Sequence, residues 1–222
     1  MQIDATRIFS LGDNAVTVEF GYTISESANN AAVGLANHFK EHPFAGFIEA
    51  VPAIASTTIF FRSHEVGRSD DLPTAFASVE AKVIEAIPLI PQVIDIATLV
   101  MEIPVSFADD DALDLNEIAL VCGISAKEVI EIFLGQTYRV YMLGFLPGFA
   151  YLGELDARIA MPRRSSPRVA VPKGSVGIAG SQTGIYPAES PGGWQIVGRT
   201  DIEIVSGDPV SPYLLAAGDS VR

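Results

Sequence analysis

The chain has 222 residues, of which 49% are apolar and 18% are charged. This composition is typical of a chain that folds throughout, whereas disordered chains have few apolar residues and a high net charge per residue. The formal net charge of −13 repels phosphate groups, so it excludes nucleic-acid binding by the surface as a whole.

The sequence indicates neither a secretory leader nor a membrane anchor. Its first residues lack the charged, apolar and small-residue pattern of a leader, and no apolar run approaches the roughly 18 residues that a bilayer span needs. Cys122 is the single cysteine, which excludes an internal disulfide, and no Cys/His cluster has zinc spacing. We expect a cytoplasmic protein with no membrane partner and no metal.

The first part of the chain predicts alternating strands and helices. Period-two alternation predicts a strand at 15–20, and Ser25 is placed to cap a helix that ends near residue 40. Two strands at 47–51 and 57–61 follow, and then a helix at 73–86. This order suits a small α+β sandwich of the ferredoxin-like kind, with a fourth strand nearby.

The segment 87–91 holds two prolines and cannot continue a helix, so it predicts a domain boundary. We therefore expect two domains, at 1–95 and 96–222. The second begins with a strand at 101–107 and two short helices joined at 122–124. Asp114 with Glu117, and Ser125 with Glu128, have capping-box spacing, and Gly123 fits a helix C-terminus.

From Tyr138 onward, short apolar stretches recur about every eight to twelve residues between Pro and Gly, which predicts a many-stranded barrel or sandwich. The fold class is therefore α+β in two domains.

The two short helices imitate a DNA-binding helix-turn-helix across 118–132. The would-be recognition helix sets only Lys127 against Glu128 and Glu131, which is the wrong sign of charge for phosphates. We therefore reject DNA binding.

All three histidines, His38, His42 and His64, lie in the first domain. The second domain thus lacks an imidazole for a Ser-His or Cys-His nucleophile, which excludes triad chemistry within it. Structural roles are expected for the histidines, and Cys122 is expected to be a buried small hydrophobe.

Charge is distributed unevenly along the chain. Residues 157–188 contain no acid, yet this window holds Arg158, Arg163, Arg164, Arg168 and Lys173. One interpretation is a local positive field suited to a carboxylate, a phosphate or an acidic partner. The alternative is that these five cations pair with acids elsewhere in the fold.

Loop-forming motifs fill the same part of the chain. The Pro-Gly turn in 141–149 (YMLGFLPGF) displays aromatic residues, and later Gly and Pro residues flank Arg, Lys, Gln, Tyr and Trp. That mixture is expected of an apolar pocket with a few placed polar groups. No phosphate-loop motif occurs, and the glycines of 174–180 do not match G-x-G-x-x-G.

These motifs resemble those of the 5-oxoprolinase B-subunit family, which includes the sporulation-kinase inhibitor KipI and is also called allophanate hydrolase subunit 1. The matching segments are FLPGFAYLG at 145–153, PRR at 162–164, VPKGSVGIAGSQTGIYPAESPGGW at 171–194 and GRT at 198–200. The likeness extends more loosely to 11–21 and 218–222. One departure is Phe133, where relatives often carry His.

The resemblance implies a ferredoxin-like first domain and a cyclophilin-like β-barrel second domain. It also implies two partners: a C subunit, related to the other half of a carboxyltransferase domain, and an A subunit. Together the three open 5-oxoproline to glutamate using ATP, and an isolated B subunit is expected to be inactive. No ATP site can be located in this chain.

Two alternatives stay open. One is a KipI-like regulator that binds and inhibits a sensor histidine kinase. The other is a carboxyltransferase half of a urea-carboxylase-like enzyme, which needs a biotin-carrying partner because this chain has no Met-Lys-Met acceptor.

Roles for individual residues follow from their chemistry, although no catalytic residue can be assigned. Four cations are expected to hold a carboxylate or acyl phosphate: Arg163, Arg164, Lys173 and Arg199. Three polar residues are expected to position an amide: Gln182, Tyr186 and Ser190. Three aromatic residues are expected to form the pocket wall: Phe145, Phe149 and Trp194.

Overall fold

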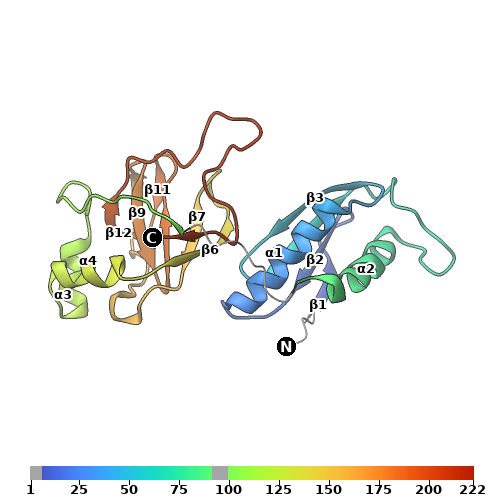
Figure 1. Cartoon of the computed structure of the whole chain (residues 1–222), viewed down its shortest axis with the longest axis horizontal. Coiled ribbons are helices and arrows are strands. Elements are labelled where there is room, and N and C mark those ends of the chain that lie inside the picture. The colour runs from blue at the N-terminus through green and yellow to red at the C-terminus, as the bar shows by residue number, and fades with distance from the viewer. Residues whose placement is uncertain (1–6, 92–99) are drawn as a thin grey trace. The chain divides into compact units, whose positions relative to one another are not determined.

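A computed structural model of the chain describes residues 7–91 and 100–222 (Figure 1). The chain divides into two compact units, Met1–Ile96 and Ala97–Arg222, and each is described by itself. Among the described residues, no helix combines the length and apolar character needed to cross a bilayer.

The first unit is a four-stranded antiparallel sheet that packs against two helices. Its elements are β1 (Arg7–Ser10), β2 (Ala15–Glu19), α1 (Glu26–Glu41), β3 (Phe47–Pro52), β4 (Ser56–Phe61), α2 (Ala75–Ala86) and the short 3₁₀ helix η1 (Ile87–Leu89). The strand order is β1-β2-β4-β3, α1 contacts β3 and β4, and α2 contacts β2 (Figure 1). The predicted order of strand, helix, strand, strand, helix is confirmed, and β1 is the additional strand.

Local capping explains why these helices begin where they do. Ser25 Oγ accepts a hydrogen bond from the Ala28 N–H (3.2 Å), and Thr74 Oγ1 accepts one from the Ala77 N–H (3.0 Å). Each bond satisfies a backbone donor that has no partner within its helix. The prediction that Ser25 caps the first helix is confirmed.

The second unit combines a mainly antiparallel sheet with two short helices. Its elements are β5 (Val100–Met101), α3 (Leu115–Cys122), α4 (Ala126–Leu134), β6 (Tyr138–Leu143), β7 (Ala150–Gly153), the 3₁₀ helix η2 (Ala157–Ile159), β8 (Arg168–Val171), β9 (Ser175–Ala179), β10 (Gln182–Ile185), β11 (Ser190–Gly192), β12 (Gln195–Arg199) and β13 (Ser220–Val221). Seven strands have the order β12-β9-β10-β7-β6-β13-β5, and β11 pairs separately with β8. β13 runs parallel to β5 and antiparallel to β6.

The seven-stranded sheet is open, so the closed barrel predicted for this region is not formed. Within the described residues, one isolated bridge between Ser106 and Arg199 links the chain after β5 to the other edge strand, β12. The predicted strand at 101–107 is correspondingly short, because β5 ends at Met101. Pro104 lies in the interrupted part, and proline has no N–H to donate to a ladder.

The helix pair α3–α4 matches its prediction except at its first cap. Ser125 and Glu128 form the predicted capping box, and Gly123 ends α3 with φ +69°. Asp114 occupies the N-cap of α3 but its side chain makes no cap hydrogen bond, so the capping box predicted for Asp114 and Glu117 is wrong. Cys122 is partly buried against the main core of this unit, less deeply than expected.

Candidate functional site

An aromatic cluster occupies the region where the loop motifs meet. The Phe149 ring lies 5.2 Å from the Tyr186 ring, 5.5 Å from the Trp194 ring and 4.9 Å from the Tyr151 ring, measured between centroids, and all three pairs are edge-to-face. Phe149, Tyr186 and Trp194 are buried. Two of the three predicted wall residues therefore form the interior of this cluster, where edge-to-face contacts stabilise the packing.

The turn that follows β6 places the third predicted wall residue, Phe145, at the surface. Its side chain is 61% exposed, and its ring lies 5.6 Å from that of Phe149. Phe145 has φ +68°, a left-handed conformation that is strained for a bulky residue. Strain of this kind concentrates at functional sites, and here it holds an aromatic ring outside the core beside a buried aromatic cluster.

Tyr186 is a buried member of the cluster that packs beside Gly192 of β11. A Cβ atom at Gly192 would stand 2.9 Å from the Cε1 and Cζ atoms of Tyr186, so only glycine fits beside this ring. Burial raises the pKa of the Tyr186 hydroxyl, although a hydrogen bond from the Trp194 backbone and the positive charge of Arg163 oppose the rise. Tyr186 is therefore a neutral hydroxyl at physiological pH.

The segment 162–164 runs beside 193–195 and is fastened to it at both ends. The Gln195 Nε2 amide donates to the Pro162 carbonyl (3.2 Å), and the Arg164 N–H donates to the Gly193 carbonyl (2.7 Å). Between these anchors, the Arg163 guanidinium carbon lies 5.9 Å from the centroid of the Trp194 ring, within cation–π range.

Asp114 binds two arginines of the acid-free window at residues 157–188. Its side chain is 2% exposed, and its carboxylate accepts hydrogen bonds from Arg164 Nη1 (2.7 Å) and from Arg168 Nη1 and Nη2 (2.8 and 2.7 Å). The hydrogen bonds to Asp114 raise the pKa of Arg168 above its ordinary value. Asp114 was not among the predicted site residues, because the spacing of Asp114 and Glu117 indicated a helix cap instead.

Most of the remaining cations are also paired. Arg158 forms an ion pair with Asp156 (2.7 Å) whose hydrogen bonds lower the pKa of Asp156 to about 2. Lys173 pairs with Glu203. Four of the five cations in the acid-free window thus bind carboxylates, as the alternative interpretation predicted. In the part of the chain that the structure describes, Arg163 has no ion pair.

Two predicted cations form a second group. Arg199 lies 3.8 Å from Asp111, and its Nε donates to the Lys173 carbonyl (3.1 Å). Arg199 and Lys173 are therefore neighbours that each have an acidic partner, in contrast to Arg163.

The remaining predicted polar residues, Gln182 and Ser190, keep buried polar atoms without a partner among the described residues. These atoms are Gln182 Nε2 and Ser190 Oγ. Ser190 pairs in register with Val171, which belongs to the aromatic cluster, and Gln182 pairs with Ala179 of the same cluster. Buried polar atoms without a partner are costly, so such atoms are candidates for binding a ligand.

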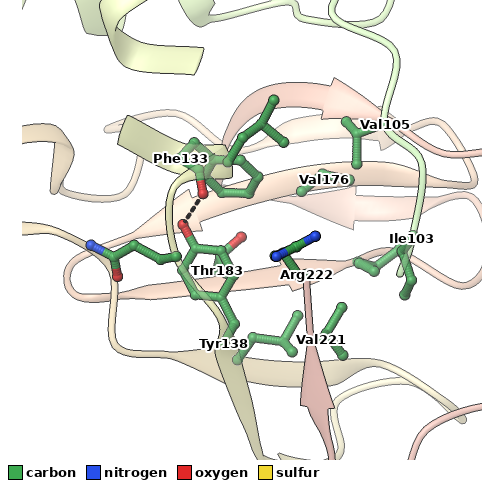
Figure 2. A pocket seen from close by; sticks show the side chains of 12 residues that line it. Ile103, Val105, Phe133, Tyr138, Val176, Thr183, Val221 and Arg222 are labelled. Carbon is green, nitrogen blue, oxygen red and sulfur yellow. Dashed lines mark hydrogen bonds between the residues drawn. The ribbon is translucent and has the colours of Figure 1, made fainter. Parts of the chain in front are cut away.

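Two hollows lie in other parts of this unit, and none of the ten predicted site residues lines either one. The first is an apolar cavity of about 40 Å³ whose wall includes Phe133 and Tyr138 (Figure 2). The Tyr138 hydroxyl donates to the Phe133 carbonyl (2.7 Å), and burial raises the Tyr138 pKa. The second is an open groove of about 460 Å³ between α4 and Arg158. In the described residues, no group of three potential metal ligands occurs.

Comparison with known proteins identifies the family. A model of the carboxyltransferase domain, subdomains C and D, matches residues 6–215. The chain is 42% identical to the B subunit of 5-oxoprolinase from Bacillus subtilis over 97% of its own length and 91% of that protein. The chain therefore belongs to the carboxyltransferase-domain family that contains the 5-oxoprolinase B subunits. It is also 36% identical to the B subunit of 5-oxoprolinase from Escherichia coli O157:H7, over 97% of this chain and 94% of the relative.

A solved structure has the same fold as this chain. The crystal structure of TTHA0988 matches 94% of the chain with 34% identity and a TM-score of 0.79. The chain spans 39% of the length of that larger protein.

Proposed function

We propose that this chain is the B subunit of an ATP-dependent 5-oxoprolinase, a hydrolase complex that opens the lactam ring of 5-oxoproline to give glutamate. The observation that carries the proposal is the 42% identity to the 5-oxoprolinase B subunit of Bacillus subtilis, across nearly the full length of both chains. The partners are the C and A subunits, and the complex acts in the cytoplasm.

In this proposal the chain contributes one wall of a shared active site. 5-Oxoproline is a small ring with an amide and a carboxylate, so its recognition needs an apolar surface, amide partners and a cation. The aromatic cluster supplies the apolar surface, with Phe145 at its exposed edge. Gln182, Tyr186 and Ser190 are proposed to position the amide, and two of these have buried polar atoms without a partner in the described parts of the chain.

We propose that the predicted cations bind the carboxylate or an acyl phosphate, and their ion pairs support an order of preference among them. Arg164, Lys173 and Arg199 already have carboxylate neighbours, whereas Arg163 has none among the described residues and lies over Trp194. A guanidinium presents parallel N–H donors to a carboxylate, and each charge-assisted bond contributes about 1.5–3 kcal/mol. Arg163 is therefore the leading candidate for the substrate carboxylate.

The chain is proposed to be inactive alone. Its histidines are His38, His42 and His64, so the second unit has no imidazole to act as a general base. The ATP site and the catalytic base are assigned to the partner proteins of the complex. We also propose that residues 1–95 form a ferredoxin-like domain and residues 96–222 a cyclophilin-like domain. The first assignment is supported by the four-stranded antiparallel sheet with two helices, and the second by the seven-stranded open sheet, whose edges are linked by the isolated bridge between Ser106 and Arg199.

The test is reconstitution of the complex by co-expression of its components, with ATP-dependent release of glutamate from 5-oxoproline as the assay. We expect activity only when this chain is present together with its partners. Within an active complex, Arg163→Gln is expected to raise KM, whereas the matched Arg158→Gln, which removes a cation already paired with Asp156, is expected to leave KM unchanged. Complexes that assemble but release no glutamate would contradict the proposal and favour a kinase regulator.

A further inference from the structure

The buried carboxylate of Asp114 points to a role beyond packing. We infer that Asp114 is a positioning residue: it binds Arg164 and Arg168 so that Arg163 alone is presented to a carboxylate ligand on the face of Trp194. This inference rests on the proposed function for the identity of the ligand, and it adds a residue that the sequence motifs did not indicate.

The hydrogen bonds of Asp114 saturate its carboxylate. Oδ1 accepts from Arg164 Nη1 (2.7 Å) and Arg168 Nη2 (2.7 Å), and Oδ2 accepts from Arg168 Nη1 (2.8 Å) and the Ile196 N–H (2.6 Å). The Asp114 N–H in turn donates to the Ile196 carbonyl (2.9 Å). Asp114 is thus held to β12 by its backbone while its side chain fixes two guanidinium groups.

Charge balance separates Arg163 from its neighbours. Glu117 lies 3.7 Å from Arg164, so two guanidinium groups, Arg164 and Arg168, face two carboxylates, Asp114 and Glu117. These four formal charges sum to zero, and the positive charge that is left on this segment belongs to Arg163. An unopposed cation near a desolvated aromatic surface attracts a carboxylate more strongly than a cation that already has an ion-pair partner.

Two anchors fix the position of Arg163. On one side the Gln195 amide binds the Pro162 carbonyl, and on the other side Arg164 is held through its N–H to Gly193 and through its side chain to Asp114. Removing the Asp114 charge weakens the anchor at Arg164, because its side chain loses an ion-pair partner, and removing the Gln195 amide releases the anchor at Pro162. If anchoring is what places the Arg163 guanidinium, both changes must weaken binding of the same ligand.

The single tryptophan of the chain makes this testable without enzymatic activity. Because Trp194 is the only tryptophan, the intrinsic tryptophan fluorescence of the full chain reports on the ring that faces Arg163. The probe is 5-oxoproline itself, titrated into the wild-type chain and into Arg163→Gln, Asp114→Asn, Gln195→Met and the control Arg158→Gln. The same variants are then assayed in the reconstituted complex for KM and kcat separately.

We expect a saturable change of emission in the wild type and in Arg158→Gln, and no change in Arg163→Gln. In Asp114→Asn and Gln195→Met the dissociation constant is expected to rise about 10- to 100-fold, the effect of misplacing one charge-assisted hydrogen bond. In the complex, KM rises by a similar factor while kcat changes less, a split that a loss of folded protein does not produce.

Each alternative outcome has a clear meaning. An unresponsive wild-type chain, or folded Asp114→Asn and Gln195→Met chains with wild-type affinity, would overturn the inference. If Asp114→Asn does not fold, Gln195→Met decides, because it removes an anchor without leaving buried charge unpaired. A normal fluorescence response in a chain whose assembled complex releases no glutamate would refute the proposed reaction and leave the positioning role intact.

Discussion

Replacing Gly192 with alanine tests the packing that supports the site. The added Cβ would lie 2.9 Å from the Cε1 and Cζ atoms of Tyr186, closer than carbon atoms approach in folded proteins. Tyr186 is 1% exposed, and its ring is held against Phe149, so it cannot move without disturbing the cluster. Overpacking of this kind costs about 1–3 kcal/mol, which lowers the folding equilibrium constant roughly 5- to 150-fold.

The neighbouring Gly193 provides a matched control. A Cβ atom there would meet Pro167 Cγ at 3.6 Å, an ordinary contact, so Gly193→Ala is expected to unfold at nearly the wild-type urea concentration. Urea unfolding followed by Trp194 fluorescence compares the two variants, because this tryptophan belongs to the same cluster. Equal unfolding midpoints for Gly192→Ala and Gly193→Ala would refute the reasoning that Tyr186 has no room to shift.

Other predictions concern stability elsewhere in the chain. Tyr138→Phe leaves the buried Phe133 carbonyl without its donor and is expected to cost about 1–3 kcal/mol in urea unfolding. Burial raises the folded-state pKa of Tyr138, so the unfolded chain loses this proton first as the pH rises. The free energy of unfolding of the wild type should therefore fall above about pH 10, by up to about 1.4 kcal/mol per pH unit. Tyr138→Phe should lack this component of the fall when both proteins are unfolded in urea across that pH range. Ser125→Ala removes the cap of α4 and is expected to lower the thermal unfolding temperature, at a cost of roughly 0.5–2 kcal/mol. Lys173→Met breaks an exposed ion pair with Glu203 and is expected to change the free energy of unfolding by less than about 1 kcal/mol; a larger loss would contradict a surface role.

Features set by local sequence were predictable. The cap at Ser25 and the capping box at Ser125 depend on residues within three positions of one another, and both predictions are confirmed. The open sheet was not foreseeable in the same way. Period-two alternation identifies strands, but it does not show that the chain at Pro104 interrupts the ladder on the way to the bridge between Ser106 and Arg199.

The candidate site shows the same division between local and distant information. Pro-Gly spacing located the aromatic cluster, although Phe149 and Trp194 proved to be buried rather than lining an open pocket. The pairing of Arg164 and Arg168 with Asp114 joins positions 50 and 54 residues apart, and no local pattern encodes it. A spacing that fits a helix cap fits a buried ion pair equally well, so only the tertiary structure distinguishes the two.

The place of β13 in the sheet has a consequence for biosynthesis. Its residues Ser220 and Val221 lie between β5 and β6, and they pair with Val100 and Met101 across some of the longest sequence separations in the unit. While the chain is being translated, β5 therefore has no neighbour in the main sheet until residues 220–221 have left the ribosome. Formation of contacts this distant in sequence is slow. The second unit therefore completes its sheet only after residues 220–221 have emerged, whereas the first unit, whose strands pair within residues 7–61, is able to fold earlier during translation.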